Sequence, residues 1–91
     1  MKLLSIIKSP LSGKKWRAKF SDGSHTDFGA SGYEDYTQHK DEDRKKSYVA
    51  RHRKNENWND PKSAGALSRW ILWNLPSFDA SVRDYKRRFG L

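Results

Sequence analysis

The sequence contains no cysteine, so disulfide bonds, thiolate metal sites and cysteine nucleophiles are excluded. It also lacks any apolar run near the roughly 18 residues that a membrane-spanning helix needs, so no membrane partner is expected. Leu, Ile, Val and Phe supply only 16 of the 91 residues, which is little for a globular core. Four Trp and four Tyr offset this shortage, because each large aromatic side chain buries much surface. We therefore expect one small folded domain over residues 1–91, with a thin core rich in aromatic residues.

Catalytic fingerprints are also missing. The chain has no phosphate-binding loop, no glycine-rich nucleotide fingerprint and no Ser, His and Asp in a hydrolase order. Its three histidines do not have the spacing of a metal-dependent nuclease, and the acidic residues within 34–43 fit no calcium-binding loop. We therefore predict a protein that is not an enzyme, with no catalytic residues, no bound metal and no other cofactor.

Positive charge is in excess and unevenly placed along the chain. The formal net charge is +8, to which residues 1–20 contribute +6, residues 21–43 contribute −6 and residues 44–91 contribute +8. A basic surface concentrates anions around it, and this favours nucleic acid or an acidic protein as the partner. Charge that only keeps the protein soluble is the alternative interpretation.

Three strands are predicted in the first part of the chain. The run 2–8 is apolar at both alternating sets of positions, which is typical of a strand covered on both faces, and it is too short for a signal peptide. Residues 14–20 alternate, with Trp16 and Phe20 on one face and bases on the other. Residues 25–29 form the third predicted strand.

The connection between the last two strands decides their register. A two-residue turn would bring Asp27 onto the apolar face. A three-residue loop with Gly23 in the left-handed conformation shifts the pairing by one residue. Phe28 then lies opposite Trp16, and Asp27 lies opposite Arg17. We predict this second register, because it buries the aromatic rings together and pairs opposite charges.

A long helix is predicted over roughly residues 33–54, with a break near residues 38–41. The segment lacks glycine and proline, and its acidic residues precede its basic ones, which complements the helix dipole. Its apolar stripe is weak and consists of Tyr33, Tyr36, Tyr48 and Val49.

Two further helices are predicted towards the C-terminus. Asp60 as N-cap and Pro61 as the first helical residue indicate a helix that continues to residue 74. It is apolar almost all round, which places it at the centre of the fold. Ser77 begins a last amphipathic helix, and Gly90 ends it.

These elements together predict an α+β fold. A three-stranded antiparallel sheet, an N-terminal meander over residues 1–30, packs on two to three helices within residues 31–91. The predicted core consists of Trp16, Phe20, Phe28, Leu67, Trp70, Ile71, Phe78 and Val82.

Three basic clusters are candidate contacts to phosphates, one on the second strand, one at the end of the long helix and one on the last helix. An ordinary solvated face, or a helix end that complements its dipole, is the alternative for the first two. For the third, ion pairs of Asp79 with Arg83 and of Asp84 with Arg88 are the favoured explanation. The candidate nucleic-acid-binding residues are Lys15, Arg17, Lys19, Lys45, Lys46, Arg51, Arg53, Lys54, Arg83 and Arg87.

Two aromatic residues are candidate anchors for a partner. Tyr48 lies among the bases of the long helix, where a ring can stack on a nucleic-acid base. Trp58 lies in a polar connector and is either an exposed anchor or a lid that folds back over the helices.

The sequence also resembles a known family, over about residues 14–90. The stretches that carry the resemblance are SDGSHTDFG at 21–29, GYEDYT at 32–37, ARHR at 50–53, NWNDP at 57–61 and AGALSRWILWN at 64–74. They are similar to small basic proteins encoded by large double-stranded DNA viruses of algae and amoebae (phycodnavirus/mimivirus-like). The resemblance implies a viral protein located in the host cytoplasm or the virion, with the host nucleus as a further alternative.

We therefore expect a non-enzymatic protein that binds nucleic acid through phosphate contacts, DNA in preference to RNA. A structural role as a minor capsid or cement protein, with capsid proteins as partners, is the main alternative. An adaptor that binds an acidic host protein is a third hypothesis.

Overall fold

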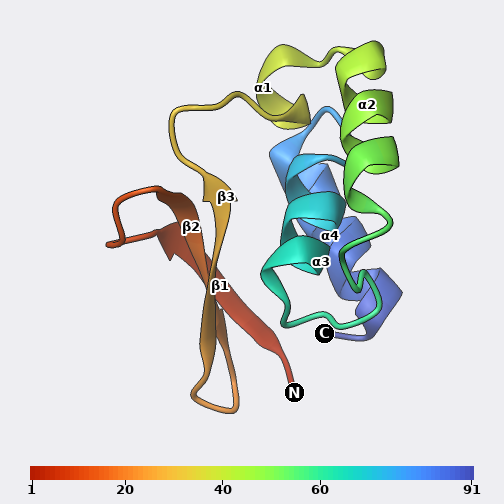
Figure 1. Ribbon diagram of the computed structural model, residues 1–91. Helices are drawn as coiled ribbons and strands as arrows, with labels where there is room; N and C mark the ends of the chain where they lie inside the picture. Colours follow the sequence, from red (N-terminus) through yellow and green to blue (C-terminus); the bar gives the residue numbers. More distant parts are fainter.

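A computed structural model describes all residues, 1–91, and contains a three-stranded antiparallel sheet in the order β1-β2-β3 (Figure 1). The strands are β1 (Leu3–Lys8), β2 (Lys14–Phe20) and β3 (His25–Ala30). Because β2 lies in the middle, β1 and β3 each have one unpaired edge. The predicted α+β fold, a sheet followed by C-terminal helices, is confirmed.

The helical part follows the sheet along the chain and packs on it as a second layer (Figure 1). Four α-helices and one π-helical segment make up this layer. They are α1 (Tyr36–His39), α2 (Glu42–His52), α3 (Ala64–Leu67), η1 (Ser68–Leu72) and α4 (Phe78–Phe89). Figure 1 shows α3 lying between the sheet and α2.

The hairpin between β2 and β3 has the predicted register. Trp16 pairs with Phe28, and Arg17 pairs with Asp27. The loop has three residues, and Gly23 has a φ of 88°, a conformation that a side chain would disfavour. The local preference of the loop and the pairing of rings therefore agree, which explains why the register is readable in the sequence.

The prediction that β1 is covered on both faces is wrong. Leu3 is buried, but Leu4 is 65% exposed and Ile7 is 43% exposed. The helices pack on one face of the sheet alone, so Ile7 on the other face stays in contact with solvent, and Leu4 lies beside α4 without being covered by it.

In place of the single helix predicted over residues 33–54, the structure has two helices, α1 and α2. The first residues of the predicted range are not helical, because the buried side chain of Asp35 accepts a hydrogen bond from the amide of Thr37 and forms a capping box with Gln38. The expected break is present at Lys40, whose φ of 56° ends α1. Asp41 then caps α2 by accepting bonds from the next amides.

The helix predicted to begin at Asp60 and Pro61 begins later, at Ala64, and its helical run ends at residue 72 instead of 74. The carbonyl of Pro61 accepts a hydrogen bond from the Tyr85 hydroxyl at 2.6 Å, and the next carbonyl accepts one from the Thr26 hydroxyl at 2.7 Å. These tertiary bonds occupy carbonyls that a helix would direct towards its own amides. Ser63 therefore becomes the N-cap.

The last helix is as predicted. Ser77 accepts a hydrogen bond from the amide of Ala80 at the start of α4, and Gly90 ends the helix with a φ of 67°. Its inward face presents Tyr85, which is fully buried.

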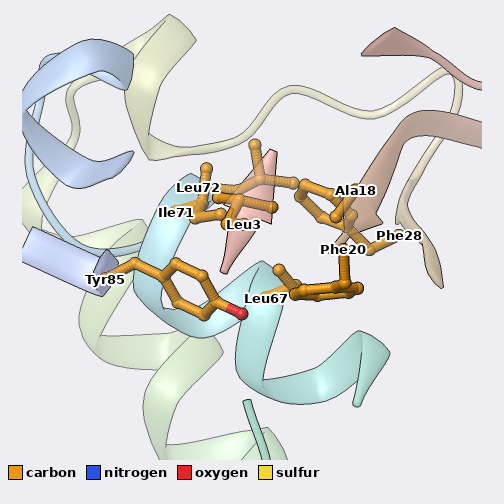
Figure 2. Close-up of a cluster of buried hydrophobic side chains, with 8 residues drawn as sticks. All are labelled: Leu3, Ala18, Phe20, Phe28, Leu67, Ile71, Leu72 and Tyr85. Carbon is orange, nitrogen blue, oxygen red and sulfur yellow. The ribbon is translucent and has the colours of Figure 1, made fainter. Parts of the chain in front are cut away.

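The core lies between the sheet and the segment that runs from α3 through η1 to α4 (Figure 2). Four of the eight predicted core residues belong to the buried cluster, and the other four are partly exposed and pack against it. For example, the ring of Trp70 is covered by the guanidinium of Arg88 at 3.7 Å from its centroid. The buried cluster is Leu3, Ala18, Phe20, Phe28, Leu67, Ile71, Leu72 and Tyr85.

The α1–α2 segment contributes nothing to this cluster. It is attached by an aromatic stack in which the ring of Tyr48 lies parallel to that of Trp73, with centroids 4.3 Å apart. Lys45 adds a hydrogen bond from its ammonium group to the carbonyl of Asn74 at 2.6 Å. Most of the surface of α2 therefore remains exposed beside the core.

Candidate functional site

A cleft of about 580 Å³ lies between the open end of the β2–β3 hairpin and α2. Residues of α3 and η1, including Ser68 and Leu72, form its floor. Gly29 is required where β3 passes this floor, because it has a φ of 83° and a Cβ there would lie 2.9 Å from the Leu72 side chain. Strand β3 thus packs against the floor of the cleft at a distance that only glycine allows.

Charges of both signs line this cleft, and part of them neutralise one another. The ammonium group of Lys15 lies 2.8 Å from a carboxylate oxygen of Asp35, and the ring of His52 shares a hydrogen bond of 2.9 Å with the carboxylate of Glu56. The charged lining groups with neither of these partners are three bases and two acids. They are Lys14, Arg44, Arg51, Glu34 and Asp43.

The outer face of the sheet carries less unpaired positive charge than the number of its bases suggests, because carboxylates pair with two of them. Arg17 donates two hydrogen bonds to the carboxylate of Asp27, at 3.0 and 3.2 Å. The guanidinium of Arg17, helped by the hydroxyl of Ser9, holds the pKa of Asp27 below its ordinary value. With Lys15 also paired, Lys19 alone of the three predicted contacts on this strand lacks an ion-pair partner.

Two more predicted phosphate contacts have partners within the protein. The ammonium group of Lys45 lies 4.9 Å from the ring centroid of Tyr36, in addition to its bond to a carbonyl. Arg87 is paired with Asp84, which Arg88 also contacts at 3.2 Å. These bonds, that of Arg87 above all, lower the pKa of Asp84.

The predicted pair of Asp84 with Arg88 is present, whereas the predicted pair of Asp79 with Arg83 does not form. Asp84 is held by bonds to both Arg87 and the amide of Asn74, and it lies at the centre of a small network. Asp79 and Arg83 are both exposed, so little favours one rotamer of either side chain.

Six of the ten predicted contact residues therefore have side chains that make neither an ion pair nor a hydrogen bond within the protein: Lys19, Lys46, Arg51, Arg53, Lys54 and Arg83. Four of these lie on α2 and in the turn after it. Arg44 also lies on α2 without an ion-pair partner, and all five are exposed. We refer to them as the α2 basic set: Arg44, Lys46, Arg51, Arg53 and Lys54.

Tyr48 is not available to stack on a base, so this prediction is wrong. Its ring is stacked on Trp73 with an interplanar angle of 3° and on His52 at a centroid distance of 4.2 Å. Two nearly parallel rings this close must lie on opposite faces, which leaves neither face free. Burial raises the pKa of the Tyr48 hydroxyl, as expected for a ring placed within the protein.

Trp58 is partly buried and acts as the lid that was one of its two predicted roles. Its indole nitrogen donates to the carboxylate of Glu56 at 2.9 Å, and its carbonyl accepts a bond from the indole of Trp70 at 3.2 Å. The guanidinium of Arg69 lies 5.4 Å from the ring. These contacts hold the connector against the helices and leave Trp58 only part of its surface for a partner.

The chain has no group of side chains typical of a metal centre and no membrane-spanning helix. No group of three or more His, Asp or Glu side chains is placed to hold a metal ion. None of the helices has the length and apolar character required to span a membrane.

The profile of one protein family matches residues 4–52, which is more than half of the chain. The chain therefore belongs to the family described as a family of unknown function, DUF5754. The match covers nearly all of the sheet together with α1 and α2, and thus both walls of the cleft. Comparisons with curated proteins and with solved structures found no match. The family description names neither an activity nor an organism, so the viral resemblance stays an expectation.

The cleft also contains residues that the predicted contact set omits. Arg44 and Lys14 line it without an ion pair, and Tyr33 lies on its rim with 74% of its surface exposed. Arg44 could have been found in the sequence, because it lies seven positions before Arg51 and so shares its helix face. The placement of Lys14 and Tyr33 depends on how the sheet meets α2, which no local pattern indicates.

Proposed function

We propose that this protein binds nucleic acid through phosphate contacts and that the α2 basic set makes most of them. The observation that carries the proposal is the lack of intramolecular partners. All five side chains are exposed, and none forms an ion pair, although acidic residues are abundant earlier in the chain. Unpaired cations in such number attract a polyanion, because each phosphate contact releases a condensed counterion.

The position of the set supports the proposal. Arg44 and Arg51 are two helical turns apart, about 10 Å along the axis, and both line the cleft. This separation allows them to contact different phosphates of one strand. Tyr33 on the opposite rim offers an exposed ring on which an unpaired base can stack.

Salt-dependent titration tests the proposal. Labelled duplex DNA, single-stranded DNA and RNA are titrated with the protein at several salt concentrations. Five contacts to duplex DNA predict that the logarithm of the association constant falls against the logarithm of salt concentration with a slope of about −4.5. DNA is the expected partner ahead of RNA.

A triple variant with Arg51→Ala, Arg53→Ala and Lys54→Ala locates the contacts. It should weaken binding to all sequences and flatten the slope by about 2–3. The matched control removes the same charge elsewhere, through Lys2→Ala, Lys8→Ala and Lys86→Ala, and should retain most of the slope. Equal flattening by both variants would reject α2 as the contact surface, and no binding at low salt would reject the function.

A second candidate function is structural, through protein–protein contacts such as those of a minor capsid or cement protein. It is favoured by apolar side chains left exposed at one edge of the sheet, namely Leu4 and Ile7 on β1 and Leu11 in the turn after it. A failed nucleic-acid titration would make this the preferred function.

A further inference from the structure

We propose that the free edge of β1, with the groove between β1 and α4, binds an extended acidic segment of a partner protein by adding it to the sheet as a fourth strand. This inference stands apart from nucleic-acid binding, because the groove lies away from α2 and involves none of the α2 basic set.

The groove has an apolar base. Its volume is about 360 Å³, and it is bounded on the sheet side by Leu3, Leu4 and Ile6 and on the α4 side by Phe78 and Val82. Leu4 is the most exposed of these, at 65%. An apolar side chain from a partner would cover Leu4 and remove this surface from water.

An irregularity in β1 directs Leu4 to the groove. The register with β2 shifts between Leu3 and Ser5, so Leu4 has no partner residue on β2. A bulge of this kind breaks the alternation of side chains along a strand. Leu3 and Leu4 consequently both line the groove, although they are neighbours in sequence.

The backbone of β1 has free hydrogen-bonding groups beside this groove. Strand β1 pairs with β2 alone, and an antiparallel pair leaves alternate amide and carbonyl groups of an edge strand pointing away from its neighbour. No hydrogen bond outside the sheet reaches the backbone between Leu4 and Lys8. An extended peptide can bond to these groups, which is the usual basis of strand addition.

The charges around the groove indicate that the added strand is acidic. Lys2 and Lys8 lie at the two ends of β1, and Arg83 and Lys86 line the groove from α4. None of these four bases forms an ion pair, and Asp79 is the one acidic residue in the lining. Acidic side chains that alternate with apolar ones would meet the bases while the apolar ones enter the groove.

The same charges oppose a second copy of this chain as the occupant. Antiparallel pairing of two β1 strands would bring Lys2 of one copy towards Lys8 of the other, and like charges placed opposite each other are unfavourable. The bases on α4 would add to this repulsion.

Peptide binding tests the inference. The probe is a fluorescent peptide of alternating Glu and Val, and the control peptide alternates Lys and Val. The acidic peptide should bind saturably and shift the backbone NMR signals of residues 4–8, while the basic peptide should not bind. A third peptide, acidic but with a central proline, should bind more weakly because it lacks one amide donor.

Variants with matched controls locate the site. Leu4→Asp should weaken binding at least about tenfold, since it places a negative charge and removes an apolar contact where the peptide lies. Arg83→Glu with Lys86→Glu should weaken it similarly. The controls are Leu11→Asp, another exposed leucine, and Arg53→Glu with Lys54→Glu, which should change the affinity less than about threefold.

Three results would overturn the inference. The first is that the acidic peptide does not bind. The second is that the peptide shifts the protein's NMR signals in α2 instead of β1. The third is that the protein self-associates, with shifts in β1, when no peptide is present. Circular dichroism of Leu4→Asp verifies the fold, which should be unchanged because the side chain is exposed. The nucleic-acid titration uses the other set of bases, so either proposal can fail without the other.

Discussion

The sheet region, residues 1–30, and the α2 region, residues 42–54, look alike in charge: each has six Lys or Arg and two acidic residues. Their charges are used differently. In the sheet region both acids are in ion pairs, Asp27 with Arg17 and Asp22 with Lys62. In the α2 region neither acid is in an ion pair with a base. Equal composition therefore leaves unequal amounts of charge available to a partner.

The two regions also differ in what they contribute to the core. Strands β1 to β3 supply four of the eight residues in the buried cluster, and α2 supplies none. Side chains on the sheet are fixed by packing on one face and by cross-strand partners on the other. Helix α2 is attached through the stack of Tyr48 on Trp73 and the bond from Lys45 to the carbonyl of Asn74, so most of its surface is free for a partner.

The largest effect expected from this comparison concerns stability. Phe28→Ala removes a fully buried ring from the sheet and should lower the free energy of unfolding by about 3–5 kcal/mol, enough to unfold a domain of this size. Tyr48→Ala should leave the sheet folded while amides of α1 and α2 exchange faster. Chemical denaturation and hydrogen exchange measure the two effects. If Tyr48→Ala made the amides of the sheet exchange as fast as Phe28→Ala does, α2 would be part of the core.

An intermediate effect is expected in acid. The pKa values of Asp22, Asp27 and Asp84 lie below the ordinary value in the folded protein, each chiefly because of a base bonded to it. Their ionised forms stabilise the fold above the ordinary carboxyl pKa of about 3.9, and this contribution is lost as the pH falls through the lowered values. Urea denaturation from pH 7 to pH 2.5 should show stability declining below about pH 4.

A single substitution connects this decline to the sheet. Asp27→Asn should lower stability at pH 7 and make the decline in acid shallower, because the bond to Arg17 no longer depends on ionisation. Asp79→Asn removes a carboxylate without an ion-pair partner and controls for the change in net charge. If both variants decline alike, the pairing in the sheet is not the cause.

The smallest expected effect is on the salt dependence of DNA binding, which should differ between variants of the two regions. Arg51→Ala removes one base without a partner and should reduce the steepness of the salt dependence of DNA binding by about 1. Arg17→Ala removes a base already paired with Asp27 and should leave the slope as it is in the wild type. A larger change for Arg17 than for Arg51 would mean that the sheet is the contact surface.

The sequence predicts best where local and tertiary preferences coincide. The β2–β3 register follows from a three-residue loop and from rings that pair across it, and α4 follows from its cap residues and its apolar spacing. The observed start of α3 differs from the predicted one because Asp60, the predicted N-cap, is as suitable locally as Ser63, which caps the helix in the structure. Hydroxyls from β3 and α4, far away in the sequence, decide between them.

The candidate site shows the same division. The bases of α2 and their exposure are foreseeable, because a weak apolar stripe leaves most of a helix in solvent. The pairing of Lys15 with Asp35 is not, since it depends on where the segment after β3 turns back over β2. The prediction for Tyr48 is wrong for a similar reason: its stacking partner Trp73 belongs to a segment that only the folded chain brings beside it.

The α+β order, the β2–β3 register, the helix ends at Ser77 and Gly90 and the excess of positive charge all follow from the sequence. Each of these depends on residues close together in the chain or on periodicity within one element. The tertiary structure alone decided which bases are neutralised, which rings are buried and which edge of the sheet stays open. Those outcomes depend on contacts between distant segments, whose distances are set only when the helices pack on one face of the sheet.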